Sequence, residues 1–300
     1  MKICIAGGTG FVGDAIIHEL QKSYCQIYVL TRSPEKYEST KNLAYIKWMS
    51  EGSAPEKELE GIDVFINLAG ESISSGRWSE ERKKKIISSR LETTQEIIRI
   101  IGSLTKKPAT FINASAIGFY GTSTDKLFTE SEYHPGNDFL ANTVYQWEKE
   151  ALKAEKIGVR TVLVRFGIIL GKEEGALPRM VLPYRLFAGG RIGSGRQWMS
   201  WIHIDDVSRA IIHCIQTNEL SGPVNFTAPK PVQMEEFGRT IAQVLHKPHW
   251  IPVPGFVLKA VLGEISILIL EGQAVLPKKL METNYTFLWP HLKDALDDLF

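Results

Sequence analysis

The sequence is poor in cysteine, and its cysteines are not arranged for disulfides or metal binding. Its 300 residues contain three, Cys4, Cys25 and Cys214, whose spacing matches neither a disulfide framework nor a zinc motif. The histidines and acidic residues lack the spacing of metal ligands as well. We therefore expect a protein without a metal site that acts in a reducing compartment, the cytoplasm.

An excess of one charge and long apolar runs are also lacking. The 35 basic and 34 acidic residues nearly cancel, which argues against nucleic acid as a partner. The most apolar late stretch, residues 256–276, contains Lys259, Glu264 and Glu271 and is too polar to span a membrane. We expect this stretch to form the helical wall of a pocket or a contact between two copies in a homodimer.

A regular alternation of strand and helix patterns is present over the first 170 residues. Short apolar runs predict strands, and amphipathic stretches between them predict helices. The strands are expected at residues 2–6, 27–30, 44–48, 64–69, 110–114 and 161–166, and the helices at 10–22, 79–101 and 139–156. This alternation predicts an α/β fold, a Rossmann-type doubly wound parallel sheet with helices on both faces.

The chain is less regular after residue 170. Proline and glycine become frequent, and the alternation weakens from Gly171 onward. We expect a dinucleotide-binding domain over residues 1–170 and a smaller, irregular substrate lobe with a C-terminal extension over residues 171–300. An apolar run at residues 224–227 is expected to return to the sheet as a later strand.

The first predicted strand runs into a glycine-rich turn typical of dinucleotide binding. Gly7, Gly10 and Gly13 follow the spacing G-x-x-G-x-x-G between a strand and a helix. Such glycines make the tight turn, let a diphosphate approach the backbone, and let helix and strand pack closely. The free N–H groups at the helix start can then bind phosphate. The expected cofactor contacts here are Gly7, Thr9, Gly10, Phe11, Val12 and Gly13.

The end of the second strand indicates which cofactor is used. Enzymes that use NAD usually place an acidic residue there, which binds the ribose 2′-hydroxyl. This sequence reads Thr31, Arg32, Ser33 instead, and a guanidinium can bind the 2′-phosphate of NADP. We therefore expect these three residues to contact NADP(H), with NAD less favoured. The alternative is that Arg32 is an ordinary surface charge.

Further segments resemble the extended short-chain dehydrogenases/reductases of the sugar-nucleotide epimerase type. Residues 67–70, 115–121 and 201–206 resemble that family's fourth-strand, fifth-strand and lobe-closing motifs. The resemblance is closer to an atypical branch, the uncharacterised epimerase family proteins. The segments that carry it are residues 67–73, 77–78, 89–94, 189–203 and 272–280, the last resembling the extra C-terminal region of that branch.

The resemblance implies the Rossmann fold and a nicotinamide cofactor. It also implies that a fifth-strand hydroxyl, here Ser115, bonds the substrate oxygen. It supplies no substrate, because the branch has no established one. The residues that it places beside the cofactor are Asn67, Leu68, Ala69 and Gly70.

The family's catalytic tyrosine and lysine are missing at the expected positions. A literal Y-x-x-x-K pair does occur at Tyr145 and Lys149. In relatives, however, a glutamate follows the lysine by four residues, and aligning it with Glu148 places the lysine at Val144 and the tyrosine at Leu140. Tyr145 and Lys149 then lie about 140° further around the helix. We treat them as an out-of-register alternative to the catalytic pair.

Four polar residues remain as candidates for the site. Arg90 stands where ordinary members have asparagine, and it could hold an anionic substrate group or the cofactor diphosphate. Ser115 follows a strand end, where parallel sheets bind ligands, although a satisfied turn hydroxyl is the alternative. Tyr120 could act in the cleft or pack in the core. Arg165 should have a ligand or a carboxylate nearby, and it is counted among the cofactor contacts.

Two functions fit these features. The first is an NADP-dependent oxidoreductase or epimerase that acts on a small polar substrate, anionic if Arg90 binds it. The second is an NADP(H)-binding sensor or scaffold without turnover, which the displaced tyrosine and lysine favour. We prefer an enzyme with an altered mechanism. A hydrolase triad from Ser200, His203 and Asp205 lacks a nucleophile-elbow motif, and we expect His203 to bond a loop carbonyl beside an Asp205-capped helix.

Overall fold

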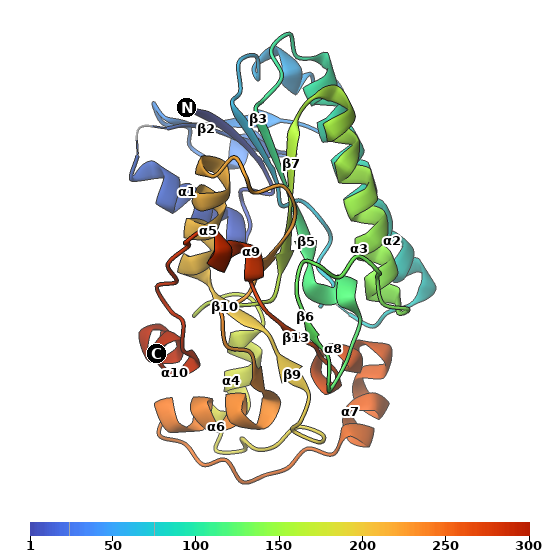
Figure 1. Cartoon of the computed structure of the whole chain (residues 1–300), viewed down its shortest axis with the longest axis vertical. Helices are drawn as coiled ribbons and strands as arrows, with labels where there is room; N and C mark the ends of the chain where they lie inside the picture. The colour runs from blue at the N-terminus through green and yellow to red at the C-terminus, as the bar shows by residue number, and fades with distance from the viewer. Residues whose placement is uncertain (24, 75) are drawn as a thin grey trace.

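The computed structural model describes residues 1–23, 25–74 and 76–300, and it is built around a seven-stranded parallel sheet (Figure 1). The strand order is β11-β7-β5-β4-β1-β2-β3, and every neighbouring pair is parallel. The predicted α/β Rossmann fold is therefore confirmed. The strands are β1 (Lys2–Ala6), β2 (Gln26–Thr31), β3 (Leu43–Lys47), β4 (Val64–Asn67), β5 (Thr110–Ala116), β7 (Arg160–Phe166) and β11 (Gly222–Phe226).

Helices cover both faces of this sheet because successive strand residues point to opposite sides. On one face, Ile3 and Ile5 pack against α1 (Phe11–Gln21) and α5 (Ile204–Gln216). On the other face, Cys4 and Ala6 belong to a second core with α2 (Glu80–Ser103) and α3 (Phe139–Ala151). Two apolar layers thus hold the sheet between its helices.

The helix bounds differ from the predictions in one informative place. The pattern over residues 139–156 predicted a single helix, but α3 ends at Ala151 and the chain continues as a 3-10 helix over Leu152–Ile157. Gly158 follows in the left-handed conformation and ends the helical segment, as glycine commonly does. Apolar periodicity alone does not distinguish an α-helix from the tighter helix that succeeds it.

Chain order reverses around β1, whose neighbours are β2 on one side and β4 on the other. The crossover helices leave this point in opposite directions, so a crevice opens at the carboxyl ends of β1 and β4. In open α/β sheets this is where ligands bind. The glycine-rich turn after β1 lies at this place.

The second half of the chain contributes to the sheet as well as to a separate lobe. The strand expected at 224–227 is β11, the edge of the sheet, and α5 also packs on the sheet. The lobe has its own apolar core, which includes residues of three helices (Figure 1). Its elements are α4 (Leu177–Arg185), α6 (Met234–Val244), α10 (Leu292–Leu299), and the paired strands β8 (Ile168–Leu170) with β10 (Trp201–His203) and β9 (Trp198–Met199) with β12 (Val232–Gln233).

The apolar stretch at residues 256–276 is only partly helical. It forms α7 (Gly255–Leu262), a 3-10 turn and α8 (Ile267–Leu270), and then runs as β13 (Ala274–Val275) beside β6 (Leu127–Phe128). A further short helix, α9 (Lys278–Glu282), follows. In the part of the chain that the structure describes, no helix is long and apolar enough to cross a membrane.

Candidate functional site

The glycine turn after β1 uses its three spaced glycines for three different purposes. Gly7 has φ +79°, and a Cβ there would lie 2.8 Å from the backbone carbon of Leu68. A Cβ at Gly13 would lie 2.5 Å from the Gly7 oxygen, so this glycine allows the helix to approach the turn. A Cβ at Gly10 would meet only the Gly7 oxygen, at 3.6 Å. The space beside Gly10 is therefore an open surface, and the packing of the fold does not require glycine at this position.

That open surface lies at the start of α1. Gly10 is the N-cap of this helix and has no side chain to satisfy the first-turn N–H groups. Thr9 and Gly10 are exposed. Phe11 packs its ring against Gly171 and Gly175, which joins the helix start to the loop after β8. The free N–H groups and the positive end of the helix dipole fit a dinucleotide diphosphate.

A cationic side chain, Arg32, follows β2, the strand that pairs with β1 and so ends beside the glycine turn. Arg32 is exposed, and the Ser33 N–H donates to the Thr31 hydroxyl at 3.3 Å, which shapes the loop. The charge of Arg32 also affects the pKa of Glu71. Hydrogen bonding from Arg82 is the main reason why the pKa of Glu71 is lowered, and the charge of Arg32 adds to it.

Asn67 is fully buried and positions the loop after β4. Its amide nitrogen donates to Thr94 at 3.1 Å and to the Asn113 side chain at 2.7 Å, and its oxygen accepts from the Ala69 N–H at 3.1 Å. The side chain is thus occupied within the protein. Asn67 thus holds the loop, and Leu68 lines the adjoining cavity; contact of Asn67 with the cofactor stays a prediction. Gly70 is exposed on the same loop.

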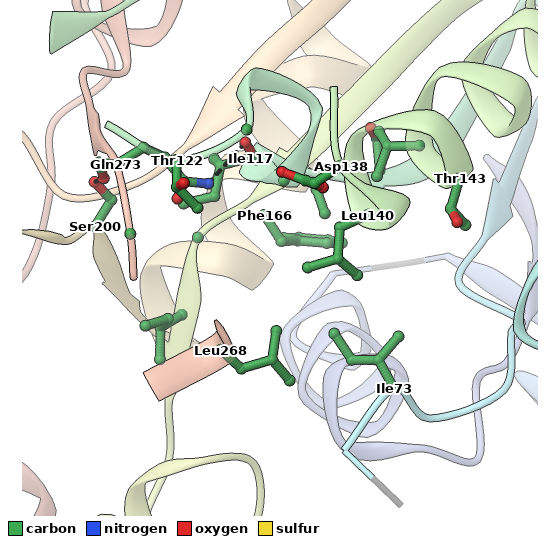
Figure 2. Close-up of a pocket in the computed structure, with 18 of the residues that line it drawn as sticks. Ile73, Ile117, Thr122, Asp138, Leu140, Thr143, Phe166, Ser200, Leu268 and Gln273 are labelled. Carbon is green, nitrogen blue, oxygen red and sulfur yellow. Dashed lines mark hydrogen bonds between the residues drawn. The ribbon is translucent and has the colours of Figure 1, made fainter. Parts of the chain in front are cut away.

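A cavity of about 420 Å³ lies beyond the carboxyl ends of β5 and β7, against the second lobe (Figure 2). Its walls come from distant parts of the chain: α3, the end of β5, and α8 of the C-terminal region. Figure 2 shows side chains from these walls facing the opening. The apolar lining includes Val12, Leu68, Ile73, Ile117, Leu140, Val144, Trp147, Phe166, Met199, Ile267 and Leu268.

The helix α3 places apolar side chains, and not the Y-x-x-x-K pair, at this cavity. Leu140 and Val144 line it. Tyr145 is 44% exposed and Lys149 is exposed on another face of the helix. The register taken from Glu148 predicts this arrangement, because a shift of five residues turns a side chain well away from its starting direction. Whether the nicotinamide lies at Leu140 and Val144 stays a prediction.

Arg90, which the sequence suggested could hold an anionic group, lies on the cavity wall. Its Nη1 donates to the backbone oxygens of Glu71, at 3.0 Å, and Ile86, at 2.9 Å. The guanidinium lies 5.1 Å from the centre of the Trp147 ring. Burial lowers the pKa of Arg90 to about 10, so the group is still a cation at neutral pH. Arg90 therefore offers positive charge to a group bound in the cavity.

Ser115 borders the cavity, but its hydroxyl has another partner. The hydroxyl donates to Glu148 Oε1 at 2.5 Å, and the residue is only 3% exposed. Glu148 is in turn paired with Arg165, whose Nε and Nη2 lie 2.7 Å from Oε1 and Oε2. Whether Ser115 also acts as a catalytic or cofactor-binding hydroxyl stays a prediction. Its proton is held by a buried ion pair.

Arg165 and Tyr120 lie in the same buried region, and each has the partner or packing that the sequence offered as an alternative to a site role. Burial is the largest single influence and opposes the charge of Arg165, but hydrogen bonding to Glu148, the charge of Glu148 and the contact with Tyr120 together outweigh it, and the pKa of Arg165 is raised. Its guanidinium stacks 3.6 Å from the Phe119 ring centre. The Tyr120 hydroxyl donates to Asn225 at 2.8 Å, and burial raises the pKa of Tyr120 to about 12. Neither side chain lines the cavity; Arg165 has the expected carboxylate and Tyr120 packs in the core.

His203 caps α5, and this also settles its tautomer. The Asp205 N–H donates to Nδ1 at 3.1 Å, so His203, and not Asp205, is the N-cap, and the expected bond to a loop carbonyl is wrong. The proton of the neutral ring is then on Nε2, 3.3 Å from Asp298. His203, Asp205 and Asp298 do lie together, but neither ring nitrogen keeps a free lone pair for a metal ion.

Sequence reasoning missed Asp138 as a cavity residue and located the far wall only within a longer segment. Asp138 is the N-cap of α3, and its Oδ1 accepts from the Ala141 N–H at 2.9 Å. An acidic residue before a helix is a recognisable cap signal, and this one also lines the cavity. Residues 267–268 and 271–273 form the far wall. They lie within residues 256–276, for which the sequence predicted either a pocket wall or a dimer contact, and their packing opposite α3 agrees with the first.

Comparison with known proteins agrees with this geometry. Residues 3–226 match the model of the NAD dependent epimerase/dehydratase family, and residues 253–299 match a domain of unknown function, DUF1731. The chain belongs to the NAD-dependent epimerase/dehydratase family. The resemblance to extended short-chain dehydrogenases/reductases is thereby confirmed. Membership implies a nicotinamide-dinucleotide site, which the turn after β1 fits.

Members of this epimerase family that resemble the chain come from several organisms. Epimerase family protein YfhF of Bacillus subtilis is 50% identical over 299 residues, which cover 100% of this chain and 98% of that protein. Human epimerase family protein SDR39U1, solved with NADPH, is 32% identical with a TM-score of 0.86 and coverages of 100% and 99%. A UDP-glucuronic acid 4-epimerase from Bacillus cereus, solved with NAD, is 18% identical with a TM-score of 0.81 and coverages of 99% and 97%, which shows the shared fold.

Proposed function

We propose that this protein is an NADP(H)-dependent oxidoreductase or epimerase with an altered active site, acting on a small molecule. The observation that carries the proposal is the position of the open Gly10 surface: the crevice at β1 and β4 adjoins a cavity lined by Val12 and Leu68. A dinucleotide held by its diphosphate at α1 extends from there toward the cavity. When bound, NADP(H) supplies a nicotinamide that accepts or donates a hydride.

Arg32 supports NADP over NAD. Its exposed guanidinium ends β2, where NAD enzymes carry a carboxylate for the ribose 2′-hydroxyl. The relatives fit either choice, since human SDR39U1 was solved with NADPH and the bacterial 4-epimerase with NAD. Our preference for NADP therefore depends on Arg32, the residue expected beside the ribose 2′-phosphate. Arg90 would hold a second anionic group, either the cofactor diphosphate or a group of the substrate.

The cofactor preference is tested by titrating NADPH and NADH into the protein by fluorescence. We expect tighter binding of NADPH. The variant Arg32→Asp should lose about 1.5–3 kcal/mol of NADPH binding, roughly ten- to a hundredfold, because a charge-assisted phosphate contact is replaced by repulsion. Arg239→Asp, an exposed arginine of α6 in the second lobe, is the matched charge-reversal control. Wild-type protein that binds NADH more tightly would contradict the proposal.

A second candidate is a cofactor-binding sensor or scaffold without turnover. The apolar Leu140 and Val144 at the cavity favour it, as does the engagement of the Ser115 hydroxyl by Glu148. The two candidates separate in a screen of NADPH oxidation against aldehydes, ketones and imines. A sensor binds NADPH and oxidises none of them, whereas an enzyme oxidises NADPH with at least one class.

The proposal also covers the compartment and the oligomeric state of the protein. We place the protein in the cytoplasm, which its three free, buried cysteines suit. A homodimer would use α7, on which Phe256 and Val261 are 75% and 60% exposed. Sedimentation equilibrium of the wild type and of Phe256→Glu tests this contact, because a dimer that uses α7 dissociates in the variant.

A further inference from the structure

The cavity beyond the glycine turn has an uneven distribution of charge. Among its described lining residues, Arg90 is the one basic side chain, and it stands on the α2 side near Trp147. The acidic lining residues are Asp138, at the start of α3, and Glu271, after α8. The wall formed with the C-terminal region is therefore apolar and negative. An anionic substrate is repelled at this wall, which leaves the cofactor diphosphate as the anionic partner of Arg90.

Asp138 is better placed than Glu271 to bind a ligand inside the cavity. One oxygen, Oδ1, accepts from the Ala141 N–H and thereby caps α3. The side chain is half-buried, and its second oxygen, Oδ2, lies beside Gly121, 3.4 Å from where a Cβ on that glycine would stand; Figure 2 shows Asp138 above Leu140. Glu271 is exposed, and one of its oxygens accepts from the Thr122 hydroxyl at 2.8 Å. Asp138 thus has an oxygen left for a ligand inside the cavity, and it borders the apolar Leu140.

The remaining walls do not suit a sugar nucleotide. A nucleoside diphosphate sugar needs cations for its diphosphate and hydrogen-bonding groups for its sugar hydroxyls. The described lining is mainly aliphatic and aromatic, as Ile73, Leu140, Phe166 and Leu268 in Figure 2 illustrate. A nicotinamide would also take a share of the 420 Å³. The space left over suits a small, mainly apolar molecule.

Proton supply gives a third, independent constraint. Reduction of a ketone to an alcohol needs a proton at oxygen, which a positioned side chain normally provides. The residues that face the cavity from α3 include Leu140 and Val144, which are apolar, and the Ser115 proton is held by Glu148. A substrate that needs no proton from the protein fits these walls better.

We infer that the cavity takes a small, mainly apolar substrate with a positively charged nitrogen, an iminium ion or its amine product, held at Asp138. The inference rests on the proposed function and names its substrate class. In the reduction, the carbon of the C=N⁺ bond gains the hydride, and the π electrons become the nitrogen lone pair. NADPH is the reductant and becomes NADP⁺, and no proton is taken from the protein.

Binding of three benzyl compounds to the NADP⁺-loaded protein tests the inference without measuring turnover. The probes are N,N-dimethylbenzylamine, a cation at pH 7, benzyl alcohol, which is neutral, and phenylacetate, an anion. Titration calorimetry should rank them amine, alcohol, phenylacetate in order of decreasing affinity. Asp138→Asn should weaken the amine about tenfold and leave the alcohol within about twofold, because asparagine still caps α3 but carries no charge.

Controls separate this inference from the proposed function. Asp138→Ser, which also caps a helix, should repeat the effect, and Asp294→Asn in α10 should leave the amine affinity unchanged. NADPH is titrated separately: a wild type that does not bind it refutes the proposed function. A wild type that binds NADPH but prefers phenylacetate, or that binds the amine equally well after Asp138→Asn, overturns the inference alone. NADPH oxidation with 3,4-dihydroisoquinoline, and none with cyclohexanone, is the expected second readout.

Discussion

At the scale of single residues, the polar groups near the cavity divide into those that face it and those that support its walls. Ser115 belongs to the second group because its hydroxyl donates to Glu148 at 2.5 Å and is buried. Arg165 holds Glu148 from the other side. Arg90 and Asp138 are the charged side chains that the proposals assign to bound groups.

Ser115→Ala tests this division. Removing a hydrogen bond to a buried carboxylate should cost about 1.5–3 kcal/mol of unfolding free energy, measured by urea denaturation. The affinity for NADPH should change less than about twofold, since the hydroxyl is already engaged by Glu148. A tenfold loss of NADPH affinity with unchanged stability would return Ser115 to the cofactor site.

The glycine turn allows a paired test of residues that the sequence motif treats alike. Gly10→Val should fold normally but lose NADPH binding by more than about a hundredfold, because its side chain occupies the open surface at the start of α1. Gly13→Ala should lose roughly 1–3 kcal/mol of stability, because its Cβ meets backbone at 2.5 Å. Thermal melts and fluorescence titrations measure both effects. A folded Gly10→Val with wild-type affinity would show that the cofactor binds elsewhere.

At the scale of elements, α5 depends on a histidine that must stay neutral. Nδ1 of His203 accepts the Asp205 N–H, and burial is the main reason why the pKa of His203 is lowered. The neighbouring carboxylates of Asp205, Asp206 and Asp298 oppose this shift. Protonation would place a hydrogen on Nδ1, facing the N–H that it now accepts, and the cap would be lost.

The direction of the pH dependence follows from this. A histidine whose pKa is lowered in the folded state binds protons more readily when unfolded, so stability falls as pH drops below the ordinary value of about 6.5. We expect the urea midpoint to fall between pH 7.5 and 5.5, and to fall less in His203→Asn, since asparagine caps a helix without titrating there. His213, whose pKa burial also lowers, contributes equally to both proteins. Parallel curves for the two proteins would contradict this account of the cap.

At the scale of the whole molecule, the sequence predicts what is local and misses what is assembled over distance. The strand, glycine turn and helix over residues 2–21 were predictable because one short segment holds all the determinants. A ligand or a carboxylate near Arg165 was predicted, but its identity as Glu148 and the link to Ser115 were not, because these residues lie on β5, α3 and β7 and have many alternative partners. The far cavity wall lies within residues 256–276, where the sequence left a pocket wall and a dimer contact as alternatives, because packing against α3 is not visible in a local pattern. The side of α3 that carries Leu140 and Val144 was also predictable, since in a helix an offset of five residues is a rotation of about 140° that separates these side chains from Tyr145 and Lys149.

The central claim is that NADP(H) binds along the β1 turn and that its nicotinamide ends at Leu140 and Val144, away from Tyr145. A crystal structure of the protein with NADPH tests it through one distance, from the nicotinamide C4 to the Tyr145 hydroxyl. We predict that C4 lies in contact with Leu140 or Val144, and that Tyr145 is separated from it by roughly the width of a helix, about 10 Å. A Tyr145 hydroxyl within about 3.5 Å of C4, with Lys149 on the nicotinamide ribose, would contradict the account and restore the ordinary tyrosine–lysine mechanism.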